Sequence, residues 1–210
     1  MSVDVSFWDR IADEYAAKPV EDPAAFERKI AVTKAALTQT SAVLDVGCGT
    51  GSLALRLAAD AGQIYGLDVS KEMIRIAEGK AAAAGVANVT FRCGTLEDAD
   101  FAPESLDVVC AYSLLHLVDD RGATLRTIYR LLKPGGAFIS STVCLGGSLV
   151  PYRLILPLMR WLGKAPRVCV LRQARLRDEI AAAGFVDLQA PDVGAKGDIA
   201  FLVARKPAAR

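Results

Sequence analysis

The stretch LDVGCGTGSLALRLA, residues Leu44–Ala58, decides the fold because it joins an apolar run to an amphipathic segment through three glycines. Gly47, Gly49 and Gly51 occupy alternate positions, and Asp45 stands just before them. Glycine lets the backbone come close to a ligand, since it has no Cβ and tolerates unusual φ values. A merely tight turn would need only one or two glycines. The spacing therefore predicts a ligand-binding turn after a strand, where doubly wound sheets bind their ligands.

Apolar runs and helical patterns alternate along the chain on both sides of this turn. Such alternation is typical of a parallel sheet with helices on both faces. The predicted strands are Ala42–Val46, Ile64–Leu67, Val89–Cys93, Leu106–Ala111 and Ala137–Val143, and the predicted helices between them are Leu53–Ala58, one capped by Ser70 that runs to Gly85, and one from about Ala123.

The C-terminal part departs from this alternation. After a predicted helix at Leu176–Ala183, the apolar runs Phe185–Gln189 and Ile199–Ala204 are separated by a turn rich in Pro and Gly. That turn leaves no room for a crossover helix, so the pair is predicted to be antiparallel. The sequence thus predicts an α/β fold with a doubly wound, mostly parallel seven-stranded sheet and an antiparallel C-terminal strand. Residues 1–210 are expected to form a single domain, which begins with two helices in residues 1–40.

Composition limits the classes of partner. The chain has 210 residues, of which 52% are hydrophobic, and this length allows one well-buried core. Its 25 basic and 24 acidic residues nearly cancel, so we expect no nucleic-acid partner drawn in by charge. Because the polar N-terminus is unlike a signal peptide, we expect a cytoplasmic protein. We expect it to be a monomer or a homodimer. Five cysteines without a CxxC pair predict buried free thiols and no metal site: Cys48, Cys93, Cys110, Cys144 and Cys169.

Two classes of ligand suit a glycine turn at this place. A dinucleotide turn requires G-x-G-x-x-G, with the pyrophosphate at the helix N-terminus. Here Ser52 stands at the sixth position, and Asp45 would place a negative charge near the pyrophosphate. A ligand with a cationic amino-acid end would instead be attracted by that carboxylate. An NAD-dependent oxidoreductase and a non-catalytic cofactor-binding subunit stay as alternatives.

The motif LDVGCGTG resembles the first motif of class I S-adenosylmethionine-dependent methyltransferases. Four further segments resemble the later motifs of that family in the same order: IYGLDVSKEMIRIA, FRCGTLEDADF, LDVVCAYSLLHLVDD and LLKPGGAFISS. The segment FWDRIADEYAAKP is similar to the N-terminal helix of small-molecule members that resemble the quinone C-methyltransferases. The resemblance covers nearly the whole chain. It implies a Rossmann-like fold, S-adenosyl-L-methionine as the cofactor and S-adenosyl-L-homocysteine as its product, with no metal.

The resemblance also implies roles for individual residues. Asp68 would hold both ribose hydroxyls, and Met73 would pack near the adenine. The helices of residues 1–40 would cover the cofactor, with an aromatic residue, Tyr15, lying over it. On the adenine side the sequence has Thr95 where the family commonly has an acid. The expected cofactor site comprises Tyr15, Asp45, Gly47, Cys48, Gly49, Gly51, Asp68, Val69, Met73, Thr95, Leu96 and Ala111.

The acceptor is expected beyond the fourth strand. Methyl transfer from a sulfonium is an in-line displacement, and orientation alone supplies about 7–11 kcal/mol in well-aligned systems. A base is therefore optional. The only histidine, His116, is the candidate base, with a structural role between Leu115 and Leu117 as the alternative, and Tyr112 is a second candidate.

Residues 145–172 form an apolar insertion after the fifth predicted strand, interrupted by Pro and Arg well short of a membrane span. We expect a lid over a small apolar acceptor, with Gly146 and Gly147 as a hinge and Leu156 and Met159 facing the acceptor. The alternatives are a segment that contacts a membrane, for a lipid or quinone acceptor, or a partner subunit, and a core helix that covers the sheet.

Overall fold

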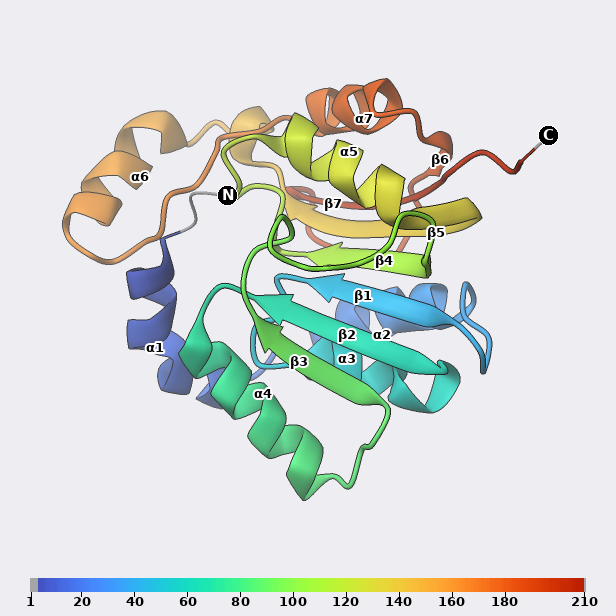
Figure 1. The fold of residues 1–210 in the computed structure, drawn as a ribbon. Coiled ribbons are helices and arrows are strands. Elements are labelled where there is room, and N and C mark those ends of the chain that lie inside the picture. The colour runs from blue at the N-terminus through green and yellow to red at the C-terminus, as the bar shows by residue number, and fades with distance from the viewer. Residues whose placement is uncertain (1–3, 210) are drawn as a thin grey trace.

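Seven strands form one sheet in residues 4–209, the part of the chain that the computed structural model describes (Figure 1). The strand order is β3-β2-β1-β4-β5-β7-β6. Strands β1 to β5 pair in parallel, and β7 is antiparallel to both β5 and β6. The strands are β1 Ala42–Val46, β2 Gln63–Asp68, β3 Val89–Cys93, β4 Leu106–Tyr112, β5 Leu132–Val143, β6 Val186–Gln189 and β7 Ile199–Arg205.

The helices cover both faces of the sheet because successive residues of each central strand point to opposite sides. Val43 of β1 packs with α2, α3 and α4, and the neighbouring Leu44 packs with α5 and α7. The helices are α1 Val5–Ala17, α2 Pro23–Lys34, α3 Ser52–Leu57, α4 Lys71–Ala83, α5 Arg121–Leu131, α6 Tyr152–Trp161 and α7 Gln173–Ala182, with short 3₁₀ turns at Ala58–Asp60 and Leu145–Gly147.

The predicted mostly parallel sheet with an antiparallel C-terminal strand is confirmed, and the main differences lie at element boundaries. Strand β5 begins at Leu132 rather than Ala137, because Leu132 already pairs with Leu106 before an irregularity at the following Pro and Gly residues. Helix α5 begins at Arg121, since Asp120 accepts a hydrogen bond from the Ala123 N–H and caps the helix.

The cysteine prediction is wrong for two of the five thiols. Cys48, Cys110 and Cys144 are buried, as expected, and all five cysteines are free. Cys93 is exposed because it ends the edge strand β3, and Cys169 is half-buried. The expected uniform burial therefore fails at the sheet edge and in the loop before α7.

Helix α1 lies at the carboxyl edge of the sheet, next to the start of α4 (Figure 1). Asp9 of α1 accepts a hydrogen bond from the Ser70 Oγ at 2.6 Å, and Ser70 in turn caps α4 by accepting from the Met73 N–H. The strand order reverses between β1 and β4, so the switch point of the fold opens at this same edge. Within residues 4–209 no helix is long and apolar enough to cross a membrane.

Candidate active site

The turn after β1 is anchored to the end of β2. The N–H groups of Gly47 and Cys48 donate to the Leu67 carbonyl at 2.7 and 3.0 Å. Gly47, Gly49 and Gly51 have φ values of 71°, 52° and 76°, in the left-handed region that favours glycine. The alternate glycines therefore build a turn that other residues would strain.

The three glycines differ in what fills the space beside them. A Cβ on Gly51 would lie 2.6 Å from Phe91 Cζ, so this glycine makes room for the protein's own core. A Cβ on Gly49 would meet only Tyr15 Cε1, at 3.9 Å. The expectation that all three open space for a ligand is corrected for Gly51, whose side-chain position is needed by Phe91.

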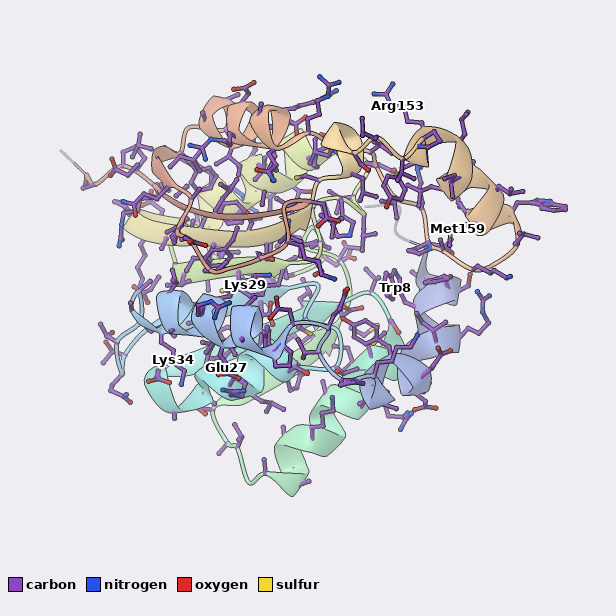
Figure 2. The ribbon with its side chains drawn as sticks, turned by 180° about the vertical axis from the view of Figure 1, so that it is seen from behind. Trp8, Glu27, Lys29, Lys34, Arg153 and Met159 are labelled. Atoms are coloured by element: carbon purple, nitrogen blue, oxygen red, sulfur yellow. The ribbon has the colours of Figure 1, made fainter. Side chains whose placement is uncertain are left out.

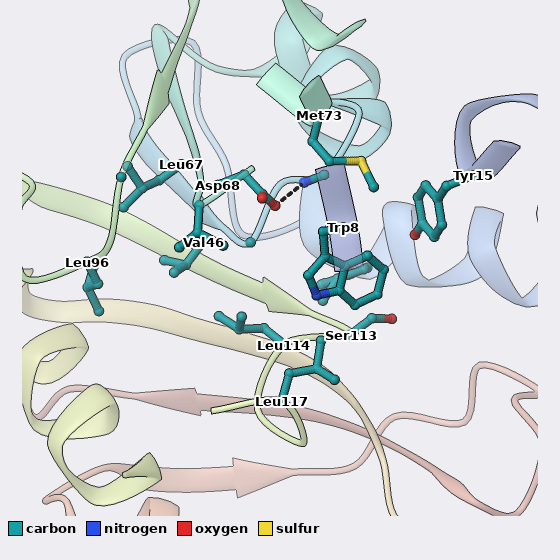
Figure 3. Close-up of a pocket in the computed structure, with 15 residues that line it drawn as sticks. Trp8, Tyr15, Val46, Leu67, Asp68, Met73, Leu96, Ser113, Leu114 and Leu117 are labelled. Carbon is teal, nitrogen blue, oxygen red and sulfur yellow. Dashed lines mark hydrogen bonds between the residues drawn. The ribbon is translucent and has the colours of Figure 1, made fainter. Parts of the chain in front are cut away.

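Asp68, at the end of β2, accepts two backbone hydrogen bonds. Its Oδ2 accepts from the Gly49 N–H at 2.9 Å (Figure 3). Its Oδ1 accepts from the Ser70 N–H, also at 2.9 Å. Burial raises the pKa of this carboxyl, and the backbone hydrogen bonds oppose the shift. Each carboxylate oxygen has two lone pairs, so each can accept one further hydrogen bond. Asp68 is thus fixed in position and still able to bind two hydroxyl groups.

Asp68 lines a cavity of about 80 Å³ with largely apolar walls. Figure 3 shows Trp8 and Leu114 projecting into the space that Asp68 and Met73 border. Val69 and Leu96, both predicted cofactor residues, also line it. The other lining residues are Tyr15, Val46, Gly47, Gly49, Leu67, Gly94, Tyr112, Ser113 and Leu117.

A second cavity, of about 490 Å³, meets the first at the glycine turn, because Gly47 and Gly49 line both. Asp45 and Cys48 lie in its wall. The Asp45 side chain is buried, and its Oδ2 has no hydrogen-bond partner among residues 4–209. Burial, with a contribution from the Asp68 charge, raises the pKa of Asp45 to about 7, against a hydrogen bond from the Ala54 backbone. A buried acceptor without a partner is costly, so this oxygen is suited to a ligand's donor.

Lys29, on α2, lines the same larger cavity and was missed by the sequence reasoning. Only 9% of the residue is exposed, and its Nζ donates to the Ser141 Oγ at 3.0 Å (Figure 2). In residues 4–209 no carboxylate lies within ion-pair distance of it, and burial lowers the pKa of the ammonium, with Asp22 opposing. Lys29 lies one turn before Thr33 on the buried face of α2, so a lysine among the inward-facing residues of this helix was the available signal.

Trp8 was also missed as a site residue. It lies seven residues before Tyr15 on α1, and the two rings meet edge to face with centroids 6.1 Å apart. Both line the smaller cavity, so α1 forms part of the cavity wall at this edge of the sheet. The spacing of the two aromatics on one helical face could have identified Trp8. Residues 1–3 of the predicted N-terminal segment lie outside the described part.

The two predicted acceptor residues near the end of β4, Tyr112 and His116, differ in their surroundings. Tyr112 lines both cavities, but its hydroxyl is engaged with Thr33 Oγ1 at 2.8 Å. Ser113, which follows, has a φ of 54° and lines both cavities as well. Such strain in a non-glycine residue is typical of functional sites, and sequence patterns give no sign of it.

His116 is not among the residues that line either cavity. It is buried, and its Nδ1 has no partner in the described chain. Burial lowers the pKa of the imidazole to about 4, so it is neutral at pH 7 and a weak base. The geometry therefore does not support the predicted role of His116 as the general base, and favours the structural alternative.

Four further predicted cofactor or acceptor residues are absent from the cavity walls. Thr95 instead pairs with Asp98, which accepts from the Thr95 Oγ1 at 2.6 Å and from the Thr95 N–H at 3.1 Å. Ala111 is buried within β4. Leu156 and Met159 belong to α6, which lines neither cavity.

The expected lid is therefore not over the site in this structure. No residue of 145–172 lines either cavity, because α6 stands beside α1 instead (Figure 1). Arg10 of α1 donates to the Gly163 carbonyl at 3.0 Å, and Arg160 of α6 lies 3.8 Å from Asp4. The core-helix alternative is wrong too, since no residue of α6 is buried.

Known proteins were compared with this chain. Residues 37–173 match the profile of a family described as a methyltransferase domain. A demethylmenaquinone methyltransferase of Geobacillus kaustophilus is 33% identical over 175 residues, which cover 70% of this chain and 71% of that protein. A ubiquinone/menaquinone biosynthesis C-methyltransferase UbiE of Geotalea daltonii is 36% identical, over 53% of this chain and 49% of that protein.

An uncharacterized methyltransferase YcgJ of Bacillus subtilis is 39% identical over 46% of this chain and 38% of that protein, so the chain spans about half or less of several curated relatives. The crystal structure of YcgJ superposes with a TM-score of 0.71, at 18% identity, over 87% of this chain and 100% of that one. In residues 4–209 no group of three or more His, Cys, Asp or Glu side chains is placed to hold a metal ion. With a family match over more than half of its length, and the glycine turn and Asp68 at the matching strand ends, the chain belongs to the methyltransferase-domain family.

Proposed function

We propose that this chain transfers a methyl group from S-adenosylmethionine to a small apolar acceptor. The observation that carries the proposal is the buried Asp45 oxygen without a partner, at the turn where Gly49 leaves open space. A cationic amino-acid end would satisfy this oxygen, whereas a pyrophosphate would be repelled by it. The residues of the turn thus fit S-adenosylmethionine better than a dinucleotide.

The opposite charges of Asp45 and Lys29 suit the two ends of an amino acid. Both side chains lie in the wall of the larger cavity and are buried. Asp45 would bind the ammonium group of the methionine part, and Lys29 would bind its carboxylate. Asp68 would bind the ribose hydroxyls with its two remaining acceptor sites, and Met73 and Leu96 would border the adenine.

When bound, S-adenosylmethionine supplies a methyl group on a positively charged sulfonium sulfur. The neutral thioether that remains after transfer is a leaving group that needs no acid catalyst. The chain's own contribution is then to orient the reactants and to exclude water. Trp8, Leu114 and Leu117 provide an apolar wall beside Gly47, and the glycine turn is held on β2 by two hydrogen bonds. Orientation of this kind is a large share of catalysis in bimolecular reactions. No general base is required for the proposal, in keeping with the position of His116.

The acceptor is proposed to be an aromatic molecule of the quinone type or one of similar polarity. Several similar proteins are named for methylation of ubiquinone or menaquinone precursors. The apolar side chains of Trp8, Leu114 and Leu117, where the cavity borders Gly47, would disfavour a charged acceptor, because a buried charge without a partner is costly.

The experiment is a methyl-transfer assay with labelled S-adenosylmethionine and a panel of apolar phenols, quinols and charged amines. We expect transfer to the apolar compounds, and an increase of at least tenfold in the KM for S-adenosylmethionine in Lys29→Met. Lys34→Met is the matched control, since Lys34 also lies on α2 but is half-exposed and pairs with Asp60 (Figure 2). Absence of transfer to every compound by a folded protein that binds the cofactor would reject the proposed acceptor class.

A further inference from the structure

Large apolar side chains are exposed chiefly on one short segment. Seven of the eleven exposed large hydrophobic residues in residues 4–209 fall between Leu149 and Leu162. Leu149 is fully exposed, and Trp161 and Leu154 are 81% and 76% exposed. A concentrated apolar surface of this kind marks an interaction site rather than ordinary surface variation.

Helix α6 presents separate stripes along its length. Leu154, Leu158, Trp161 and Leu162 follow the spacing i, i+4, i+7, i+8, so they share one face, and all four are exposed. Tyr152, Ile155 and Leu156 are half-buried and, at the spacing i, i+3, i+4, share another face of the helix.

Basic residues form a third stripe. Arg153 and Arg160 lie seven positions apart, two turns along the same side of α6, next to Leu154 and Trp161. Arg153 has no ion-pair partner in residues 4–209, and Lys164, just after the helix, has none there either. Figure 2 shows Arg153 at the outer edge of the molecule.

The sequence around α6 lacks acidic residues altogether. Between Asp120 and Asp178 there are eleven Lys and Arg residues and no Asp or Glu, although the whole chain carries a net charge of only +1. The sequence is therefore strongly asymmetric in charge. Five of the eleven basic residues pair with acidic residues from other parts of the chain, among them Arg160 with Asp4, whereas Arg153 and Lys164 beside the exposed apolar stripe have no ion-pair partner in residues 4–209. A protein partner of mixed charge would not require this imbalance.

We propose that α6 and its flanking residues, Leu149–Lys164, dock this protein on an anionic membrane surface. A helix that lies in the membrane interface combines an apolar face with basic residues beside it, and often a Trp at the boundary. Ten residues are too few to span a bilayer but sufficient to lie in its interface. The basic stripe would meet anionic headgroups while Leu154, Leu158, Trp161 and Leu162 enter the acyl boundary.

Docking in this way would bring the site close to the membrane. The turn that follows α6 is bonded to α1, because Arg10 donates to the Gly163 carbonyl, and α1 carries Trp8 and Tyr15 of the smaller cavity. An apolar acceptor dissolved in the bilayer would then be near the cavities. The access of a bilayer-dissolved acceptor to the cavities rests on the proposed function, whereas the docking of α6 on a membrane does not rest on it.

The test is co-sedimentation of the full chain with vesicles of phosphatidylcholine alone and of equal parts phosphatidylcholine and phosphatidylglycerol. No cofactor or acceptor is added, so a failure here is distinct from a failure of the proposed reaction. We expect binding to the mixed vesicles that weakens as salt is added, and at least tenfold weaker binding to phosphatidylcholine alone.

Paired variants separate the two stripes. Leu154→Ser with Trp161→Ser should weaken binding to mixed vesicles at least tenfold, and Arg153→Gln with Arg160→Gln should remove most of the salt dependence. The matched controls are Val186→Ser, on the edge strand β6, and Arg92→Gln, on the opposite edge strand β3, both at exposed positions. The controls should bind as the parent does. All variants are expected to keep the parent melting temperature, since no residue of α6 is buried.

Fluorescence provides a second measurement. The chain has two tryptophans, so Trp161 is the single reporter in a Trp8→Phe background. A blue shift of its emission on addition of mixed vesicles supports insertion. The proposal would be overturned by absence of binding to mixed vesicles, or by vesicle binding that survives loss of either stripe. It would also be overturned by a blue shift that appears without vesicles when only the protein concentration is raised, because a second copy of the chain would then be the occupant.

Discussion

Asp45 lies one residue before the end of β1 and Asp68 ends the adjacent strand β2, yet their surroundings give them different tasks. Asp68 is held by two backbone N–H groups, whereas one oxygen of Asp45 is left without a partner among the described residues. Burial raises the pKa of both, and that of Asp45 reaches about 7. Asp68 is therefore preorganised before the ligand arrives, and Asp45 is the residue whose charge the ligand must stabilise.

The first prediction concerns the pH dependence of cofactor affinity. A cationic ligand binds the ionised form of Asp45, which in the free protein is lost as the pH falls through about 7. The dissociation constant for S-adenosylmethionine should therefore rise as the pH decreases below 7, by up to about tenfold per pH unit. Calorimetric titration across this range measures it. Asp45→Asn should bind weakly and without the pH dependence; a parent profile that is flat through pH 7 would contradict the role given to Asp45.

The second prediction is that Asp45 lowers the stability of the free protein at neutral and higher pH. Its pKa in the folded state lies above the usual 3.8, so its contribution to stability is present at low pH and lost as the pH rises through about 7. Asp45→Asn cannot ionise and should raise the free energy of unfolding at about pH 8, by up to about 4 kcal/mol. Denaturant unfolding at about pH 8 and about pH 5 should show the gain shrinking at the lower pH.

The third prediction separates two glycines of one turn. Gly51→Ala places a Cβ against Phe91 and should destabilise the fold by about 1–3 kcal/mol beyond the cost of its positive φ. Gly49→Ala carries a similar backbone cost but points toward open space, so it should chiefly weaken S-adenosylmethionine binding. Thermal unfolding and calorimetry on both variants measure this. Equal loss of stability in the two would show that the turn is purely structural.

At the scale of elements, α1 connects the site to the start of α4. Asp9 joins Ser70, which follows the strand that carries Asp68, while Trp8 and Tyr15 on the same helix line the smaller cavity. The position of α1 over the site thus depends on a polar contact at a helix N-terminus, in addition to its buried residues Phe7 and Ala12.

The fourth prediction follows from that contact. Asp9→Ala should weaken S-adenosylmethionine binding severalfold, because α1 loses its hydrogen bond to Ser70 and holds Trp8 and Tyr15 less firmly. The stability cost should be modest, about 1 kcal/mol, as for a lost helix cap. Asp13→Ala is the control on the same helix, since Asp13 is exposed and pairs only with Arg75 at the surface. If both variants bind equally well, α1 is not positioned through Asp9.

At the scale of the whole molecule, local sequence patterns predicted the features that depend on neighbours in the chain. The strand and helix alternation, the glycine turn and the position of Asp68 after β2 all follow from short-range spacing. Ser113 could not be predicted, because its role arises where the end of β4 meets other segments. For Lys29 the only sequence signal was a lysine on the inner face of α2, and its contact with Ser141 depends on the packing of α2 against β5. The prediction that α6 lies over the acceptor was wrong for the same reason. Its apolar character can be read from local sequence, but its placement beside α1 depends on contacts such as that of Arg10 with Gly163.

The central claim, that the two cavities beside the glycine turn bind S-adenosylmethionine, is tested most directly by calorimetric titration of the full chain with that compound and with NAD. We predict binding of S-adenosylmethionine, no measurable binding of NAD, and at least tenfold weaker binding of S-adenosylmethionine by Asp68→Ala, which loses charge-assisted hydrogen bonds worth about 1.5–3 kcal/mol. Absence of S-adenosylmethionine binding by the folded parent, or equal affinity in Asp68→Ala with its fold intact, would contradict the account.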